Sequence, residues 1–278
     1  FIIQISRGAR GYSDKRFLEA MIRTAQEVFP ETIFAVHLDH GTEEVCYDCI
    51  ESGFYSSVMI DASHEPFDKN IEITRRIVQR AHDKGIVVEA ELGQLGGVEE
   101  DVVGSVCLTE APQAAEFVQR SGCDSLAVAI GTSHGAYKFT RKPSGDVLKM
   151  DLIEEIHRRL PNTHLVMHGS SSVPHELIDI INKYGGKMKE SYGVPVEAIQ
   201  KGIRHGVRKI NVDTDSRLAM TGAVRKVLAE TPEKFDPRDY MKPAREAMAQ
   251  VVKERMIAFG QAGWADKVPN VSLDAMAK

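Results

Sequence analysis

The chain has 278 residues, of which 42% are hydrophobic and 27% charged, and its net charge of −5 gives a sequence pI near 6.1. This composition is typical of a soluble globular protein with one large α/β domain or two small ones. The acidic balance argues against a nucleic-acid partner, which requires a basic stripe, and no apolar run approaches the roughly 20 residues of a membrane span.

The first residues form an apolar, strand-like run, FIIQIS, that opens without a methionine. No basic segment precedes this run and no small-residue cleavage site follows it, so it does not resemble a signal peptide. We expect the chain to be truncated upstream of Phe1.

Four cysteines bear on the compartment. Cys46 and Cys49 lie three residues apart in EEVCYDCIES, on a predicted helix. A redox pair or half of a zinc knuckle is one interpretation, but no second CxxC or nearby pair of histidines supports it. Cys107 and Cys123 show no disulfide spacing either. Packed free thiols, and therefore a reducing cytoplasm, are the better interpretation.

Short apolar runs alternate with amphipathic segments along the chain. Most of the runs are rich in Val, Ile and Ala, as in parallel strands that are buried on both faces. In the segments between them apolar residues recur at helical spacing, the first after a predicted cap at Ser13. The predicted strands are 1–5, 33–38, 57–60, 86–91, 125–130, 164–167 and 208–212, and the predicted helices are 13–28, 70–84, 110–120, 151–160, 174–183, 215–230 and 237–259.

This alternation predicts an α/β fold with a parallel sheet. Seven strand–helix units over roughly 220 residues favour a TIM (β/α)₈ barrel that lacks its first β/α unit and carries a C-terminal helical extension. A doubly wound sheet is the alternative, but no GxGxxG follows the first strand. The sequence shows no internal repeat and no convincing domain boundary, so we expect residues 1–278 to form a single domain. The segment 183–194 is rich in Gly and Lys and is predicted to be a loop.

Polar side chains follow nearly every predicted strand. Because the carboxyl ends of barrel strands converge on one mouth, where TIM barrels build their active sites, we expect these side chains to lie close together. A single strand-end histidine is more often a structural residue than a ligand, so the whole set carries the argument. The set consists of Ser6, Asp39, His40, Asp61, Glu91, His134, His168, Asn211 and Asp213.

Three of these residues, His40, His134 and His168, follow different strands. Three imidazoles with an open fourth position describe a catalytic Zn²⁺ site. By strand alternation His37 does not share a face with His40, so we interpret it as structural or as a support for a ligand.

Carboxylates accompany the histidines. Asp39 is a candidate general acid or base, or else it orients a ligand histidine. Asp61 and Glu91 could add a second cation position. Glu99 follows the Gly-rich segment GQLGG, which could close over the mouth as a lid.

Phosphate-binding features cluster late in the chain. The segments HGSS (168–171) and NVDTD (211–215) follow the two strands whose loops commonly hold phosphate in TIM barrels. Ordinary turn and cap chemistry is the alternative for each residue alone. The candidate groups are Gly169, Ser170, Ser171 and Thr214, with positive charge from Lys138 and Arg217.

The segments HLDHG, VMIDAS, EAELGQLGG, AIGTSHGAYK, VMHGSSSVP and INVDTD, in this order, resemble a class II (zinc-dependent) fructose-1,6-bisphosphate aldolase. The resemblance extends over essentially the whole chain. GTSHGAYKF and DPRDYMKPAREAM resemble the bacterial, Calvin-cycle-associated branch in particular. The family begins with a strand and a helix that would precede Phe1, including an asparagine near the substrate.

The resemblance implies reversible cleavage of fructose 1,6-bisphosphate to dihydroxyacetone phosphate and glyceraldehyde 3-phosphate, with Zn²⁺ stabilising the enediolate, in glycolysis, gluconeogenesis or the Calvin cycle. It implies a cytoplasmic homo-oligomer, dimer or larger, with a second divalent cation and a monovalent cation, Na⁺ or K⁺. The residues that match the family's motifs are Asp39 and Glu99 (catalytic), His40, His134 and His168 (zinc), Asp61 and Glu91 (second cation), and Ser6, Gly135, Lys138, Gly169, Ser170, Ser171, Asn211, Val212, Asp213, Thr214 and Arg217 (substrate).

Other functions compete with this interpretation. A Schiff-base aldolase requires a lysine at a strand end, whereas Lys209 lies early in its predicted strand. A zinc hydrolase on the same fold could also use three histidines and an aspartate, but it typically needs no paired phosphate loops. A barrel without turnover could serve as a structural subunit. Among sugars, tagatose 1,6-bisphosphate and sedoheptulose 1,7-bisphosphate remain alternatives.

Overall fold

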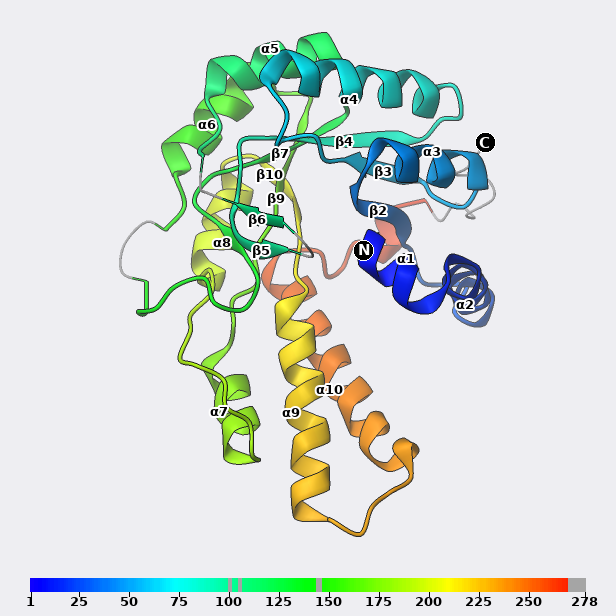
Figure 1. Cartoon of the computed structure of the whole chain (residues 1–278), viewed down its shortest axis with the longest axis vertical. Helices are drawn as coiled ribbons and strands as arrows, with labels where there is room; N and C mark the ends of the chain where they lie inside the picture. Colours follow the sequence, from blue (N-terminus) through cyan, green and yellow to red (C-terminus); the bar gives the residue numbers. More distant parts are fainter. Residues whose placement is uncertain (100–101, 105–106, 144–146, 270–278) are drawn as a thin grey trace.

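The computed structural model describes residues 1–99, 102–104, 107–143 and 147–269, and at 97–99 and 102–104 it describes the backbone alone. Seven parallel strands form its main sheet (Figure 1). In spatial order they are β1 (Ile2–Ser6), β2 (Ala35–Gly41), β3 (Ser57–Ile60), β4 (Val87–Leu92), β7 (Ser125–Val128), β9 (His164–Met167) and β10 (Val207–Ile210). All seven predicted strands are confirmed. Most of their ends lie one or two residues from the predicted bounds.

Both faces of this sheet are covered, as the apolar strands predicted. In β3, Val58 and Ile60 belong to the large core between the sheet and the helices. Met59, which points the other way, packs with Ala127 and Val166 in a small separate cluster inside the curled sheet. Strand alternation therefore divides the apolar residues between an outer core and an inner one.

The sheet curls so that its two edges approach each other. Among the described residues no backbone ladder joins β10 to β1. Lys209 on β10 nevertheless lies 3.2 Å from His37 on β2, measured between Nζ and Nε2. Such a contact across the interior requires a half-barrel rather than a flat sheet, so the predicted TIM-type architecture holds and a doubly wound sheet is wrong.

Helices cover the outside of the sheet and extend below it (Figure 1). The predicted helices are all present, and α1 and α8 were not predicted. The predicted cap at Ser13 is wrong, because Ser13 is the last residue of α1. Asp14, at φ 49°, separates the two helices and caps α2 by accepting a hydrogen bond from Arg16 N. The helices are α1 (Arg7–Ser13), α2 (Lys15–Val28), α3 (Glu43–Ser52), α4 (Phe67–His82), α5 (Ala111–Ser121), α6 (Met150–Arg159), α7 (His175–Lys183), α8 (Val196–Arg204), α9 (Thr214–Glu230) and α10 (Pro237–Ala258), followed by a 3₁₀ turn, η1 (Ala265–Lys267).

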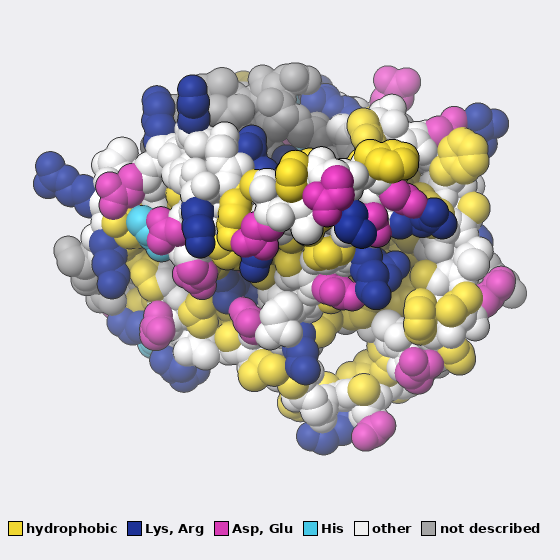
Figure 2. Space-filling model, turned by 90° about the horizontal axis from the view of Figure 1, so that it is seen from below, with side chains coloured by type: hydrophobic (Ala, Val, Ile, Leu, Met, Phe, Trp, Pro, Cys, Tyr) yellow, Lys and Arg dark blue, Asp and Glu magenta, His cyan; other side chains and the backbone are white. Residues whose placement is uncertain are grey.

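Helices α9 and α10 pack against each other and project away from the sheet, with α7 beside α9 (Figure 1). Viewed from below, acidic and basic side chains are intermixed over this end of the molecule and apolar ones lie between them (Figure 2). None of the helices in the described ranges combines the length and the apolar character that a membrane span requires.

A second, smaller sheet consists of β5 (Gly96–Glu99), β6 (Val102–Gly104) and β8 (Ser133–His134), in the order β6-β5-β8. Its existence was not predicted, because GQLGG had been interpreted as a loop. Strand β5 pairs with β8 in parallel, with Gly97 opposite His134. The segment that leads to Glu99 is therefore held beside one of the candidate zinc ligands.

The cysteines are free thiols, as predicted: Cys46, Cys49 and Cys123 are buried and Cys107 is exposed. Burial raises the pKa of the Cys49 thiol to about 11. Arg10 on α1 donates a hydrogen bond to its sulfur, so this thiol helps to attach α1 to α3.

Candidate active site

The three histidines predicted as metal ligands converge at the carboxyl end of the parallel sheet. One nitrogen from each of His40, His134 and His168 lies within 4.8 Å of the other two. His40 Nε2 and His168 Nδ1 are 3.0 Å apart. Two imidazole nitrogens on a tetrahedral Zn²⁺, each about 2.0–2.1 Å from the ion, lie about 3.3 Å apart. The spacing of these donors therefore fits a single small cation.

A β-bulge and a strained residue bring His40 to the site. The ladder between β2 and β3 shifts its register between Leu38 and Gly41, and His40 has φ 46°. In a regular strand the neighbouring residues Asp39 and His40 would point to opposite faces. A bulge re-aims one side chain, and backbone strain of this kind is common at functional sites.

Gly169 brings the loop of His168 against the loop of His134. Its φ is 62°, and a Cβ at this position would collide with the backbone carbonyl group of Ser133. Only glycine allows so close an approach with a left-handed backbone. The distance between two of the three candidate ligands therefore depends on this contact.

Two carboxylates set the tautomers of the candidate ligands. Asp61 Oδ2 lies 2.9 Å from His40 Nδ1, and Glu89 Oε1 lies 2.8 Å from His168 Nε2. An ionised carboxylate only accepts hydrogen bonds, so each neutral ring carries its proton on the nitrogen that faces the carboxylate. The remaining lone pairs, on His40 Nε2 and His168 Nδ1, face each other, and a cation between them would satisfy both.

The ionised state of Asp61 is supported by its surroundings. Burial alone would raise the pKa of this carboxyl, but the hydrogen bond from His40, aided by bonds from the hydroxyl and backbone N–H of Ser63, holds the pKa well below its usual range. Asp61 also forms a second potential cation cluster with His40 and Glu91. His40 thus belongs to both clusters.

Asp39 lies beside the histidines. The amide nitrogen of Asn211, directly after β10, is 3.5 Å from Asp39 Oδ1 and 3.1 Å from His168 Nδ1. Asn211 Oδ1 is buried and has no hydrogen-bond partner among the described residues. A buried acceptor in this position is suited to a hydroxyl group of a bound ligand.

The predicted phosphate segments meet at the start of α9. Ser170 N donates to Asn211 O, and Ser171 Oγ accepts a hydrogen bond from Asp213 N. Ser170 and Ser171 are buried, and Thr214 is the first residue of α9. The two loops thus form one surface next to a helix N-terminus, an arrangement that favours anions.

Other predicted substrate residues lie at the edges of this region. The hydroxyl of Ser6 accepts a hydrogen bond from Ala9 N and caps α1, and Ser6 pairs with Asp39 in the ladder. Lys138 Nζ donates to the carbonyl oxygen of Ser133. Arg217 is 78% exposed and pairs with Asp213. Gly135 follows His134 with φ 82°, Val212 follows Asn211, and the side chain of Glu99 lies outside the described residues.

One of the histidine placements was wrong. His134 does not end a strand of the main sheet: β7 stops at Val128, and His134 lies on β8 of the small sheet. Sequence periodicity could not find a strand of two residues.

Sequence reasoning also missed Glu89, which faces the interior from the middle of β4. Its signal was the sequence EAE, because alternation places Glu89 on the same face as Glu91 and a carboxylate interrupts an otherwise apolar strand. Lys209 was predicted to lie early in its strand, but it occupies the third position of the four-residue β10. Its Nζ donates to Glu89 Oε2 at 2.7 Å, so Lys209 is the ion-pair partner of Glu89.

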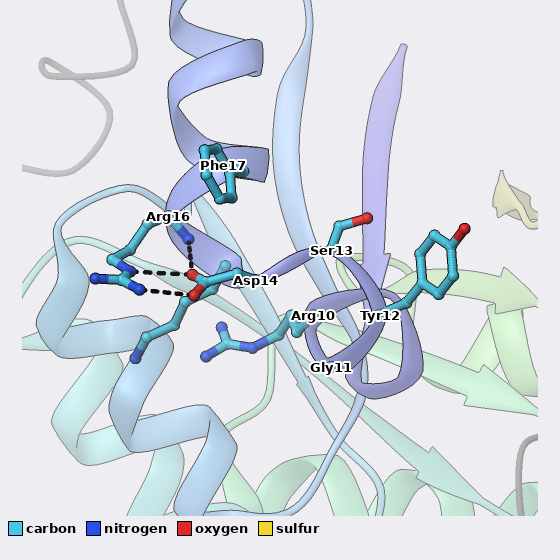
Figure 3. A pocket seen from close by; sticks show the side chains of 8 residues that line it. Arg10, Gly11, Tyr12, Ser13, Asp14, Arg16 and Phe17 are labelled. Carbon is cyan, nitrogen blue, oxygen red and sulfur yellow. Dashed lines mark hydrogen bonds and ion pairs between the residues drawn. The ribbon is translucent and has the colours of Figure 1, made fainter.

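A surface pocket elsewhere, at the corner between α1 and α2, is lined by residues 10–17 (Figure 3). Its cationic groups are paired: Asp14 binds Arg16, and Asp48 binds both Arg10 and Lys15. The pocket therefore offers no cluster comparable with the histidines.

Comparisons with known proteins agree with the geometry. The profile of the family described as fructose-bisphosphate aldolase class-II matches residues 1–264. Fructose-bisphosphate aldolase from a Nostoc strain is 52% identical over 297 aligned residues, covering 99% of this chain and 82% of the relative. The Giardia intestinalis fructose-bisphosphate aldolase is 54% identical over 275 residues, with 98% and 84% covered. The crystal structure of the YdjI aldolase from Escherichia coli K12 has a TM-score of 0.73 at 28% identity and covers 95% of this chain and 83% of its own.

Proposed function

The chain belongs to the class II fructose-bisphosphate aldolases, and from this premise we propose that it catalyses reversible aldol cleavage of fructose 1,6-bisphosphate at a Zn²⁺ centre. The products are dihydroxyacetone phosphate and glyceraldehyde 3-phosphate. The observation that carries the proposal is the convergence of three imidazoles whose tautomers are set by neighbouring carboxylates.

His40, His134 and His168 are the residues that would hold the metal. Nitrogen donors in a three-histidine set suit Zn²⁺ and leave a position open. When bound, Zn²⁺ supplies a Lewis acid that polarises the C2 carbonyl of the sugar. Asp61 and Glu91 would provide a second cation position, and a monovalent cation, Na⁺ or K⁺, would accompany the phosphate.

Asp39 is proposed as the group that exchanges a proton with the C4 hydroxyl. Cleavage of the C3–C4 bond leaves an electron pair on C3 that spreads toward the C2 carbonyl, while the C4 hydroxyl loses its proton to Asp39 and becomes an aldehyde. Asp39 lies next to His40 in the chain and within 3.5 Å of Asn211 Nδ2, which orients it at the mouth. Glu99 then protonates C3, and the pairing of β5 with β8 supports its access to the site.

Two phosphates set the register of the flexible sugar, and correct positioning contributes a large part of the rate enhancement. Gly135, Gly169, Ser170, Ser171 and Asn211, together with Val212, Asp213 and Thr214, are proposed to bind the dihydroxyacetone phosphate half. Ser6 and Lys138 would add further contacts. Arg217, exposed on the first turns of α9, is proposed to bind the second phosphate.

The wider assignments rest on the same family membership. We infer one domain over residues 1–278, a homo-oligomer (dimer or larger), a cytoplasmic location, and a role in glycolysis, gluconeogenesis or the Calvin cycle. Tagatose and sedoheptulose bisphosphates remain alternative substrates, because they differ from fructose 1,6-bisphosphate only at C4 or by one carbon.

The proposal is tested by a coupled cleavage assay on the three sugar bisphosphates, before and after EDTA treatment. We expect cleavage of fructose 1,6-bisphosphate, its loss with EDTA and its return with Zn²⁺ at about one catalytic ion per chain. Chelator-insensitive cleavage with borohydride trapping of the substrate would instead indicate a Schiff-base aldolase.

A further inference from the structure

A buried ionic network lies inside the curled sheet, below the candidate metal ligands. The side chain of Glu89 on β4 is 2% exposed. An ionised carboxylate in such a place is costly unless it is paired and hydrogen-bonded. The groups that pair with the Glu89 carboxylate therefore indicate the role of this buried charge.

The two oxygens of Glu89 face different partners. Oε1 accepts a hydrogen bond from His168 Nε2 at 2.8 Å, and Oε2 accepts one from Lys209 Nζ at 2.7 Å. Burial alone would raise the pKa of Glu89, but Lys209 and the bond from His168 hold the pKa below its usual range. Both oxygens of Glu89 are therefore occupied as acceptors, one by His168 and the other by Lys209.

His37 completes the network from the far side. Because an ammonium group only donates, His37 Nε2 accepts from Lys209 Nζ at 3.2 Å. His37 Nδ1 then carries the ring proton and donates to Ser57 Oγ at 2.8 Å. Lys209 is thus held between His37 and Glu89, and its position depends on three strands, β2, β4 and β10.

The network has a direct consequence for His168. With Nε2–H held by Glu89, the ring presents the lone pair of Nδ1 toward His40 Nε2. A ligand histidine whose second nitrogen donates to a carboxylate has a fixed tautomer and orientation and is a stronger ligand.

We propose that Glu89 is a positioning residue that fixes the tautomer and orientation of His168 for metal binding, and that Lys209, supported by His37, holds Glu89 in place. This inference rests on the proposed metal site. The competing explanation is that the Glu89–Lys209 pair only ties β4 to β10 across the interior.

The variants Glu89→Gln and Glu89→Gln/Lys209→Met separate the two explanations. The double variant removes both buried charges, so neither is left unpaired, yet His168 still lacks a carboxylate acceptor. Glu43→Gln is the matched control, because Glu43 pairs with Arg76 on the outer surface, between α3 and α4. Zn²⁺ affinity is measured by competition with a chelator, the visible spectrum after Co²⁺ substitution reports ligand geometry, and thermal unfolding reports stability.

We expect both Glu89 variants to bind Zn²⁺ about 10–100-fold more weakly than the unmodified protein and the control, with an altered Co²⁺ spectrum. If the single variant fails to fold, the double variant decides the question. Wild-type Zn²⁺ affinity and Co²⁺ spectrum in the double variant would overturn the inference and leave only the structural tie. An unmodified protein that binds Zn²⁺ but cleaves no bisphosphate would refute the proposed function while leaving this comparison intact.

Discussion

Arg255, near the end of α10, binds Asp215, in the first turn of α9, through two hydrogen bonds to Oδ2, from Nε at 3.1 Å and from Nη2 at 2.9 Å. Asp215 is fully buried and also accepts hydrogen bonds from Ser172 N and Val173 N. Those two residues continue the loop that follows His168, and Val173 has a left-handed backbone with φ 48°. The C-terminal helix is thus connected through one carboxylate to the loop for which phosphate binding is proposed.

This connection predicts the effect of Arg255→Met. Removal of one partner leaves Asp215 buried with its charge uncompensated, which costs about 3–5 kcal/mol. We expect the free energy of unfolding in denaturant to fall by that order, and KM for the bisphosphate to rise more than kcat falls. Arg245→Met, on the exposed side of the same helix, is the control. Equal stability of the two variants would contradict this account of the loop.

Asp39→Ala tests the proton-transfer assignment. If Asp39 takes the C4 hydroxyl proton, kcat should fall about 10²–10⁴-fold while Zn²⁺ content remains unchanged. The measurements are turnover in the coupled assay and metal analysis of the purified variant. Loss of the metal would instead assign Asp39 to orienting a ligand, and near-normal turnover would refute any catalytic role.

Gly169→Ala tests the contact that sets the distance between His134 and His168. The new methyl group meets the Ser133 carbonyl, so the loop must move and Zn²⁺ affinity should fall at least 10-fold. Gly53→Ala is the matched control, since Gly53 has a similar φ of 67° and no atom within 4 Å of the added carbon. The control should lose only about 1 kcal/mol of stability and no Zn²⁺ affinity. Equal Zn²⁺ affinity in the two variants would show that the approach of the loops does not matter.

The buried histidine His37 predicts a pH dependence of stability. Burial, together with the charge of Lys209, lowers its pKa to about 3 from an ordinary value near 6.5. Between these values the unfolded chain binds a proton that the native protein does not. Protonation of His37 in the unfolded chain therefore lowers the free energy of unfolding as the pH falls from 6.5 toward 3, by up to about 1.4 kcal/mol per pH unit.

The measurement is denaturant unfolding of the protein and of His37→Gln at several pH values in this window. The variant should show a shallower decrease on acidification, because one titrating group is absent. His164→Gln, at an exposed position, provides the control. Identical slopes for His37→Gln and the unmodified protein would show that His37 is not held neutral.

The order of the helices and strands, and the α/β class of the fold, could be predicted from the pattern of apolar residues alone. In runs such as 57–60 and 164–167 every residue after the first is apolar, as strands buried on both faces require, and the helices between them repeat apolar residues every three to four positions. Strand ends in a parallel barrel share one mouth, so His40 and His168 could be assigned to one site from the order of the elements alone.

The way in which those side chains meet could not be predicted from that pattern. The bulge that turns His40 toward Asp39's side, the short β8 that carries His134, and the close approach of Gly169 to Ser133 all depend on contacts between distant segments. The pairs Glu89–Lys209 and Arg255–Asp215 join residues 120 and 40 positions apart. The periodicity of a sequence indicates which face of a strand a residue occupies. The residue that it meets across the interior depends on how the sheet curls, and the curl results from the packing of all the strands and helices together.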